Sequence, residues 1–368
     1  MESGHACGWG LVLLRVVVKL RSDPIPIMLN ARPPLALIAL GSLTTVAGAY
    51  VAAAVARGAR RNRSHASSRA AGVWMAVGMG AGTIASPRVA ASDAQAEVLR
   101  AAWSADDELA ALASRGRTIV NKACTYHDAD LALHGRLVWT EDAESGTPRP
   151  GVLLVHTAVG PSDLFMLWRA EALASRGYVV LIADCLGDDR GSGWDAAWAV
   201  PRRQELMDDR SMLARRVRLG MDALVRAASH EAPPVDAARI AAVGYCFGGR
   251  AVLDLMRTDP EGLVGVVSFH GILDAHPAPR GVTSLRARVL LCHADADPFV
   301  PPPALSACLG QLSELGARYQ LLAFGGGTLH GFTNPAQALN ERKEFDYDEH
   351  AARASWAAAK LFLEDALR

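Results

Sequence analysis

Gly244-Tyr-Cys-Phe-Gly-Gly249 is the stretch of sequence that decides the fold of this chain. It follows an apolar run, ARIAAVGY at 238–245, that is typical of a buried strand, and it leads into a helical pattern at 248–257. A sharp turn between a strand and a helix requires small residues on both sides of its central position. That position is Cys246, which is held clear of the sheet at a helix N-terminus, where a thiolate is stabilised. The pattern therefore predicts a nucleophilic cysteine rather than one that only packs.

Strand-like and helix-like runs alternate on both sides of this turn. Continuous apolar runs predict buried strands, and apolar residues at helical spacing predict helices. The expected strands are 131–139, 151–156, 178–184, 238–245, 263–269, 288–292 and 318–324, and the expected helices are 164–177, 194–226, 248–257, 304–315 and 348–367. This alternation favours an α/β fold with a mostly parallel central sheet and helices on both faces. With the nucleophile between a strand and a helix, the expected fold is that of the α/β-hydrolases.

The N-terminal part of the chain differs in composition from the rest. We expect residues 1–115 to form an extension and 120–368 to form the α/β-hydrolase domain. The uncharged stretch 35–56 is long enough to cross a bilayer, and four arginines at 57–63 would stay on the cytoplasmic side. Three interpretations stay open for it: a membrane anchor, a cleaved targeting segment, or a wrongly assigned start with no biological role.

Charge and cysteine content narrow the classes of partner. The chain has 38 basic and 38 acidic residues, so nothing predicts a nucleic-acid partner, and a small or weakly charged substrate fits better. The six cysteines include no C-x-x-C pair and no zinc-like spacing, so no metal site is expected. Cys185 and Cys292 end apolar runs, which predicts buried, reduced thiols and a soluble catalytic domain inside the cell. The sequence does not indicate an oligomeric state.

A nucleophile needs a base, and the base needs an acid that orients it. In α/β-hydrolases the three follow one another along the chain as nucleophile, acid and histidine. The loop 294–301 follows the strand at 288–292 at the sheet edge where ligands bind, and it holds Asp295 and Asp297. We prefer Asp297 because Pro298 fixes the loop beside it, whereas Asp295 can cap the turn.

The expected base is His330. It lies in a glycine-rich loop, 325–335, after the last expected strand, from which a histidine can reach back across the sheet edge to Cys246. His270 and His293 end strands, where a histidine is more often structural, and His350 lies on the terminal helix.

An acyl-transfer site also needs two donors for the negative oxygen that develops during the reaction. One should be the backbone N–H of Phe247, directly after the nucleophile. The second should come from the loop after the strand at 151–156, where Ala158 is the candidate.

These motifs together resemble the dienelactone hydrolases, also called carboxymethylenebutenolidases, over residues 125–368. The resemblance rests on GYCFGG at 244–249, DADPFVP at 295–301 and HGFTNP at 330–335. It implies the α/β-hydrolase fold, no cofactor, and opening of a lactone ring to a linear keto acid. The family's catalytic triad falls on Cys246, Asp297 and His330.

The sequence departs from the family's pattern at two positions near these motifs. Thr157 stands where the family has a glutamate that helps to form the thiolate, and Asn334 stands where it has an arginine for the substrate carboxylate. Both are candidate substrate-binding residues. A cation could come from Arg202, Arg203 or Arg210, among which spacing does not choose, and Arg210 is our candidate.

Three functions are weighed. The main hypothesis is a cysteine-dependent lactone or carboxylic ester hydrolase that works through an acyl-enzyme. The second keeps the same three residues but acts on thioesters or simple esters, as the substitutions at Thr157 and Asn334 suggest. The third is an inactive binding protein tethered to a membrane through 35–56.

Overall fold

The computed structural model describes residues 88–141, 146–187, 198–227 and 232–368. The stretch 35–56 lies outside these residues, so its three interpretations remain open. In the part of the chain that is described, no helix combines the length and apolar character needed to span a membrane. These described residues belong to one compact unit.

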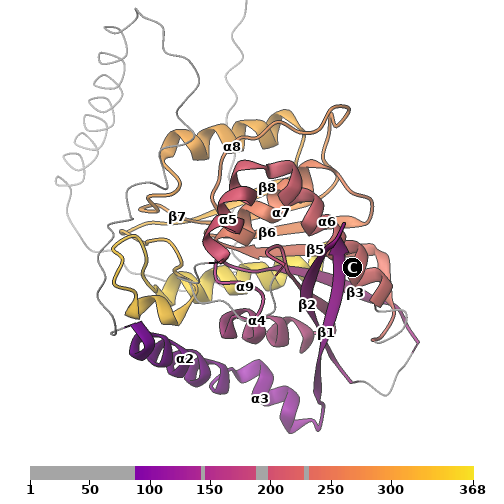
Figure 1. The fold of residues 1–368 in the computed structure, drawn as a ribbon, viewed down its shortest axis with the longest axis vertical. Coiled ribbons are helices and arrows are strands. Elements are labelled where there is room, and N and C mark those ends of the chain that lie inside the picture. Colours follow the sequence, from indigo (N-terminus) through magenta and orange to yellow (C-terminus); the bar gives the residue numbers. More distant parts are fainter. Residues whose placement is uncertain (1–87, 142–145, 188–197, 228–231) are drawn as a thin grey trace, which may run out of the picture. The chain divides into compact units, whose positions relative to one another are not determined.

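The centre of this unit is an eight-stranded sheet (Figure 1). Its strands lie in the order β1-β2-β4-β3-β5-β6-β7-β8. β1 pairs with β2 and β2 with β4 in antiparallel fashion, and the remaining neighbours are parallel. The strands are β1 (Ile119–Asp128), β2 (Leu131–Thr140), β3 (Arg149–Val155), β4 (Val179–Ala183), β5 (Val235–Tyr245), β6 (Leu263–Phe269), β7 (Arg288–Ala294) and β8 (Tyr319–Phe324). The expected mostly parallel sheet is confirmed, with β1 as a strand that the sequence analysis did not predict.

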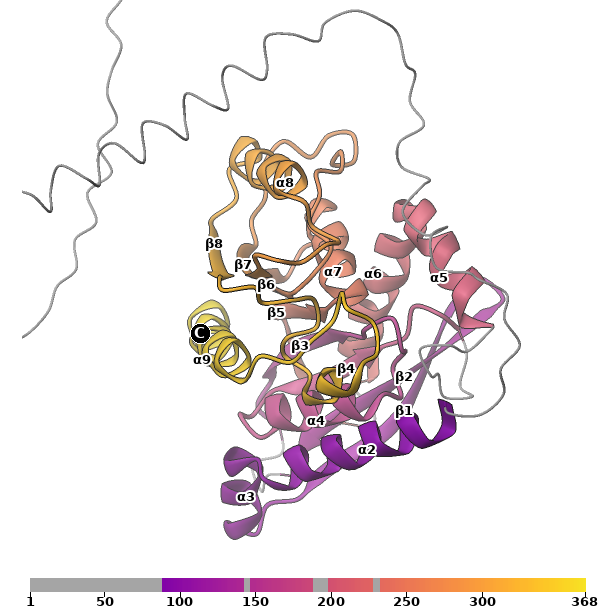
Figure 2. The same ribbon diagram turned by 90° about the vertical axis from the view of Figure 1, so that its left-hand side faces the viewer.

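Helices cover both faces of the sheet (Figures 1 and 2). They are α2 (Arg88–Ser104), α3 (Asp107–Ser114), α4 (Leu164–Ala174), α5 (Ala199–Asp208), α6 (Arg210–Ala227), α7 (Phe247–Arg257), α8 (Pro302–Glu314), a short 3-10 helix η1 (Pro335–Leu339) and α9 (Glu349–Ala366). α6, α7 and α8 lie on one face, and α4 and α9 on the other. The single helical segment expected at 194–226 is divided into α5 and α6, with Asp209 between them.

The alternating side chains of the strands divide the core into two layers. On β3, Leu153 and Val155 face the layer with α6 and α7, whereas Val152 and Leu154 face the layer with α4 and α9. All four are fully buried. A strand that is buried on both faces must be apolar throughout, which is why GVLLV is a continuous run and not an alternating one.

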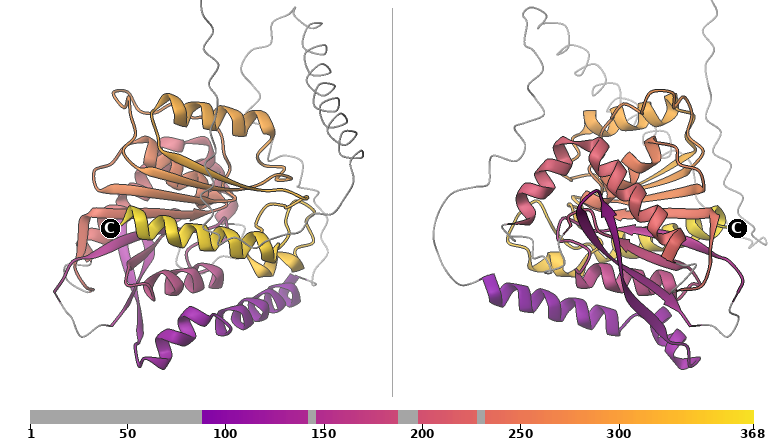
Figure 3. Two further views of the ribbon diagram at one scale, coloured as in Figure 1. Left: turned by 180° about the vertical axis from the view of Figure 1, so that it is seen from behind. Right: turned by 45° about the vertical axis from the view of Figure 1, so that its right-hand side comes forward.

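Two helices precede the sheet and pack beside α4 (Figure 3). Asp106 caps the N-terminus of α3 and also accepts a hydrogen bond from the Trp168 indole at 2.8 Å. Glu108 on α3 forms ion pairs with Arg176, which follows α4, and with Lys360 on α9. The helix α3, which the sequence analysis places in the extension, is therefore attached both to α4 and to α9.

The turn between β5 and α7 is strained and tightly packed. Cys246 adopts φ +56° and ψ −116°, a backbone conformation that residues other than glycine rarely adopt. A Cβ on Gly244 would lie 2.1 Å from the Gly248 carbonyl oxygen, and a Cβ on Gly248 would lie 2.2 Å from that of Val155. Only glycine allows α7 to start this close to β3 and β5.

Replacing Gly244 with alanine should therefore destabilise the unit. We expect the free energy of unfolding to fall by at least about 2 kcal/mol, because the new methyl group meets backbone that cannot move aside. Gly310→Ala is the matched control, since a Cβ there meets nothing within 4 Å and alanine favours the interior of α8. That variant should be as stable as the original or more stable by up to about 1 kcal/mol. Urea unfolding of both variants measures this, and equal stabilities would contradict the prediction.

Candidate active site

The candidate residues come from four loops at the carboxyl edge of the parallel strands. Ala158 follows β3, Cys246 follows β5, Asp297 follows β7 and His330 follows β8. Because neighbouring parallel strands end at the same edge, residues that are up to 172 positions apart in the chain can meet there.

The structure brings Cys246, Asp297 and His330 together. Nδ1 of His330 lies 2.6 Å from Oδ2 of Asp297, and both side chains are buried. The second oxygen of Asp297 accepts a hydrogen bond from the backbone N–H of Phe299 at 2.9 Å. The other side of the imidazole forms a hydrogen bond with Cys246. Because Nδ1 faces Asp297, Nε2 is the nitrogen that faces the sulfur.

Charge is stabilised on both members of the Cys246–His330 pair. Burial raises the pKa of the Cys246 thiol, but the nearby His330 charge and hydrogen bonds outweigh it, so that the pKa is below its usual value. Burial lowers the pKa of His330, but the Cys246 thiolate and Asp297 raise it to about 10. Each partner therefore favours the charged form of the other.

The two expected oxyanion donors also point at the sulfur. The backbone N–H groups of Phe247 and Ala158 both form hydrogen bonds with Cys246 and help to lower its pKa. Donors that converge on the sulfur in this way can also reach an oxygen on a carbon bonded to it.

Three aromatic rings surround the His330 imidazole. His270, Phe299 and Phe345 each meet it edge to face, with ring centroids 5.2, 4.9 and 5.3 Å away. His270 is buried, and its Nε2 lies 2.8 Å from the Thr333 hydroxyl. The sequence analysis set His270 aside as structural. Its position at the end of β6, the strand next to β5, was the available signal that it lies near Cys246.

The three candidate substrate-binding side chains have other partners. The Thr157 hydroxyl accepts the Val159 N–H at 3.2 Å within its own loop. Arg210 forms a buried ion pair with Asp254 and a second ion pair with Asp274.

Asn334 caps η1, where its side-chain oxygen accepts the Ala336 N–H at 2.9 Å. The geometry thus gives Arg210 and Asn334 structural partners, and we do not assign either of them to the substrate.

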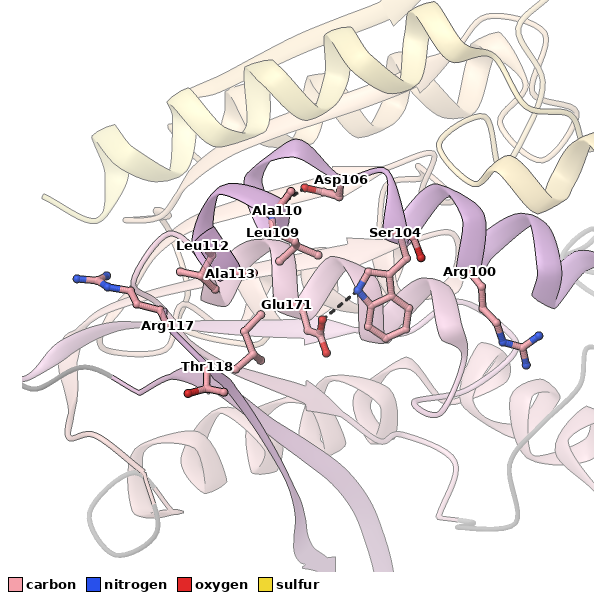
Figure 4. Close-up of a pocket in the computed structure, with 12 residues that line it drawn as sticks. Arg100, Ser104, Asp106, Leu109, Ala110, Leu112, Ala113, Arg117, Thr118 and Glu171 are labelled. Atoms are coloured by element: carbon pink, nitrogen blue, oxygen red, sulfur yellow. Dashed lines mark hydrogen bonds between the residues drawn. The ribbon is translucent and has the colours of Figure 1, made fainter. Parts of the chain in front are cut away.

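A surface cavity of about 550 Å³ lies between α2, α3 and the start of β1 (Figure 4). Trp103 and Glu171 form part of its wall, joined by a hydrogen bond of 2.9 Å from the indole Nε1 to the carboxylate. None of the residues that surround Cys246 lines this cavity. The candidate active site is therefore identified by its converging side chains and not by this hollow.

Comparisons with known proteins agree with the fold. A model of the dienelactone hydrolase family matches residues 135–367. The carboxymethylenebutenolidase homolog of Rattus norvegicus is 28% identical over 234 residues, which cover 62% of this chain and 91% of that protein.

Among solved structures, a dienelactone hydrolase-like promiscuous phosphotriesterase P91 from metagenomic libraries is 30% identical, with a TM-score of 0.61. The match covers 68% of this chain and 99% of that one. A second structure, named m3DLH, is 31% identical with a TM-score of 0.60 and the same coverage. The expected α/β-hydrolase fold is confirmed.

The paired charges predict how Cys246 reacts with iodoacetamide at different pH values. Only the thiolate reacts, so the midpoint of the labelling curve should lie below the usual thiol value of about 8.5. His330→Asn removes the charge that lowers the pKa of Cys246, and the midpoint should rise by about one pH unit or more. Mass spectrometry of the peptide containing Cys246 separates its labelling from that of Cys185 and Cys292, whose pKa burial raises. Identical curves for the two proteins would refute the ion pair.

Proposed function

Because this chain belongs to the dienelactone hydrolase family, we propose that it cleaves a lactone or carboxylic ester through a thioester formed on Cys246. Its family and its relatives make it a hydrolase that acts on lactone or ester bonds. The observation that carries the proposed mechanism is the chain of contacts from Asp297 through His330 to Cys246.

The first half of the reaction forms the acyl-enzyme. The Cys246 thiolate attacks the carbonyl carbon, and the carbonyl oxygen becomes an oxyanion held by the N–H groups of Phe247 and Ala158. The oxyanion collapses, the carbon–oxygen bond to the leaving group breaks, and the departing oxygen takes the proton from Nε2 of His330. In a lactone the departing oxygen stays attached to the acyl group, so the ring opens.

The second half releases the product. Neutral His330 takes a proton from water, and the resulting hydroxide attacks the thioester carbon. A second oxyanion forms in the same place and collapses by breaking the bond to sulfur. The carboxylic acid leaves, and Cys246 and His330 return to the thiolate and imidazolium with which they began. Asp297 holds the imidazole in one orientation throughout.

This scheme removes the need for a glutamate at position 157. Nε2 of His330 holds the proton of the thiol in the resting site, since its pKa is about 10 whereas that of Cys246 is below its usual value. Thr157 then needs only to shape the loop that carries Ala158.

A second candidate function is hydrolysis of simple carboxylic esters or thioesters by the same three residues. It is supported by Asn334, because this side chain caps η1 at the position where the family has a cation for the substrate carboxylate. An uncharged acyl group needs no such cation.

The acyl-enzyme predicts a complete dependence on Cys246. Cys246→Ala should lower kcat for p-nitrophenyl acetate by at least about 1,000-fold, because no other group forms the covalent bond. Cys124→Ala, a change on β1, is the matched control and should keep the original activity. Mass spectrometry of the original enzyme, quenched during turnover, should find the acetyl mass on Cys246. Full activity of Cys246→Ala would exclude this mechanism.

The choice between the two substrates is decided by their relative turnover. If the substrate is a dienelactone, kcat/KM for a dienelactone that carries a carboxylate should exceed that for p-nitrophenyl acetate and fall as salt is added. If simple esters are the substrates, we expect the reverse order and little effect of salt. Steady-state kinetics with both compounds at low and high ionic strength measures this directly.

A further inference from the structure

The loop after β3 carries one of the two proposed donors for the oxyanion, the backbone N–H of Ala158. The direction of a backbone N–H depends on how its peptide group is held. The Ala158 N–H lies in the Thr157–Ala158 peptide plane, and the next plane, Ala158–Val159, limits how far the first can turn. In this structure each of the two planes is held by a buried side chain that does not belong to the proposed triad. We propose that Arg203 is a positioning residue whose guanidinium, together with the His156 imidazole, fixes these planes so that the Ala158 N–H faces the oxyanion. The inference rests on the proposed function.

The first plane joins Thr157 to Ala158. Its carbonyl oxygen lies 2.6 Å from Nδ1 of His156, and it also accepts the Gly160 N–H at 3.3 Å. The N–H of the same plane is that of Ala158, and in a trans peptide it points away from the carbonyl. Holding the oxygen on one side therefore directs the N–H to the other side, where it meets Cys246.

The second plane joins Ala158 to Val159. Nη1 of Arg203 donates a hydrogen bond to the Ala158 carbonyl at 2.9 Å. Arg203 lies on α5 and is only 6% exposed, so water competes little for this bond. With both planes held, little freedom is left at Ala158.

Arg203 also supports the first plane through its charge. Nε2 of His156 accepts the Cys185 N–H at 3.2 Å, which requires a neutral imidazole with its proton on Nδ1. Burial lowers the pKa of His156, and the nearby Arg203 charge lowers it further, whereas Asp184 raises it. The guanidinium thus favours the neutral imidazole, whose free Nε2 accepts the Cys185 N–H and whose Nδ1–H faces the Thr157 carbonyl.

A different role for Arg203 would be to bind a carboxylate of the substrate. The two roles differ in what they do to a neutral substrate. A positioning residue acts on the oxyanion, which every ester forms, so its loss lowers kcat for charged and neutral substrates alike. A carboxylate-binding residue acts on ground-state binding, so its loss raises KM for the charged substrate only.

The experiment compares Arg203→Met and Arg203→Lys with Arg286→Met in the full chain. Arg286 is the matched control because it also donates to a backbone carbonyl, that of Asp259 at 2.7 Å, outside the candidate site. We expect kcat for p-nitrophenyl acetate to fall roughly 10- to 100-fold in both Arg203 variants, because a misaligned donor stabilises the oxyanion poorly. KM should stay within about 3-fold, since the donor acts mainly in the transition state. Arg286→Met should behave as the original enzyme.

The lysine variant separates geometry from charge. Lysine keeps the positive charge but lacks the planar fork that reaches the Ala158 carbonyl, so it should not restore kcat. Full recovery in Arg203→Lys would overturn the positioning role, as would an unchanged kcat in both variants. A rise in KM confined to a dienelactone that carries a carboxylate would also overturn it, in favour of substrate binding. Thermal unfolding of both variants shows whether they are folded. If both have lost the fold, the positioning role is overturned and Arg203 is assigned to stability instead.

Failure of this inference is distinguishable from failure of the proposed function. If Cys246→Ala remains active, or no acetyl group is found on Cys246, the proposed function fails whatever Arg203 does. If those two results are as expected and the Arg203 variants keep the original kcat, only the positioning role fails.

Discussion

The close approach of α7 to the ends of β3 and β5 is the constraint on which the site depends. Gly244 and Gly248 let backbone meet backbone without a side chain between them. This approach forces Cys246 into its left-handed conformation and sets its sulfur beside the first N–H of α7. It also brings the end of β3 next to the sulfur, which places the second N–H, that of Ala158. Strain at one residue is thus tied to the position of both donors.

Two ionisable side chains meet at this point, the half-buried Cys246 and the buried His330. An isolated thiolate or imidazolium in this position would be costly, because burial disfavours each charged form. Together they stabilise each other, and Asp297 supplies the hydrogen bond that the far side of the imidazole needs. Aromatic rings then surround His330 and restrict its movement. This pairing favours the charged form of Cys246 without a further base, which fits the threonine at position 157.

The sequence predicts the parts of this arrangement that local pattern controls. The sharp turn at 244–249, the order of Cys246, Asp297 and His330, and the alternating strands and helices can all be predicted, because spacing along the chain determines them. Contacts between distant segments cannot be predicted in this way. The bond from Arg203 to Ala158 joins residues 45 positions apart, and nothing near either residue indicates it. Asn334 shows the opposite difficulty, since an asparagine before a proline is as typical of a helix cap as of a binding residue.

Glu108 contacts Lys360, 252 residues away, so α3, near the start of the compact unit, meets its last helix, α9. Closing so long a loop carries a large entropic cost, which must be met by contacts made elsewhere first. During synthesis, Lys360 emerges from the ribosome only after the whole sheet has been made. The ion pair between α3 and α9 is therefore a late event in folding, and it joins the two ends only when the chain between them is complete.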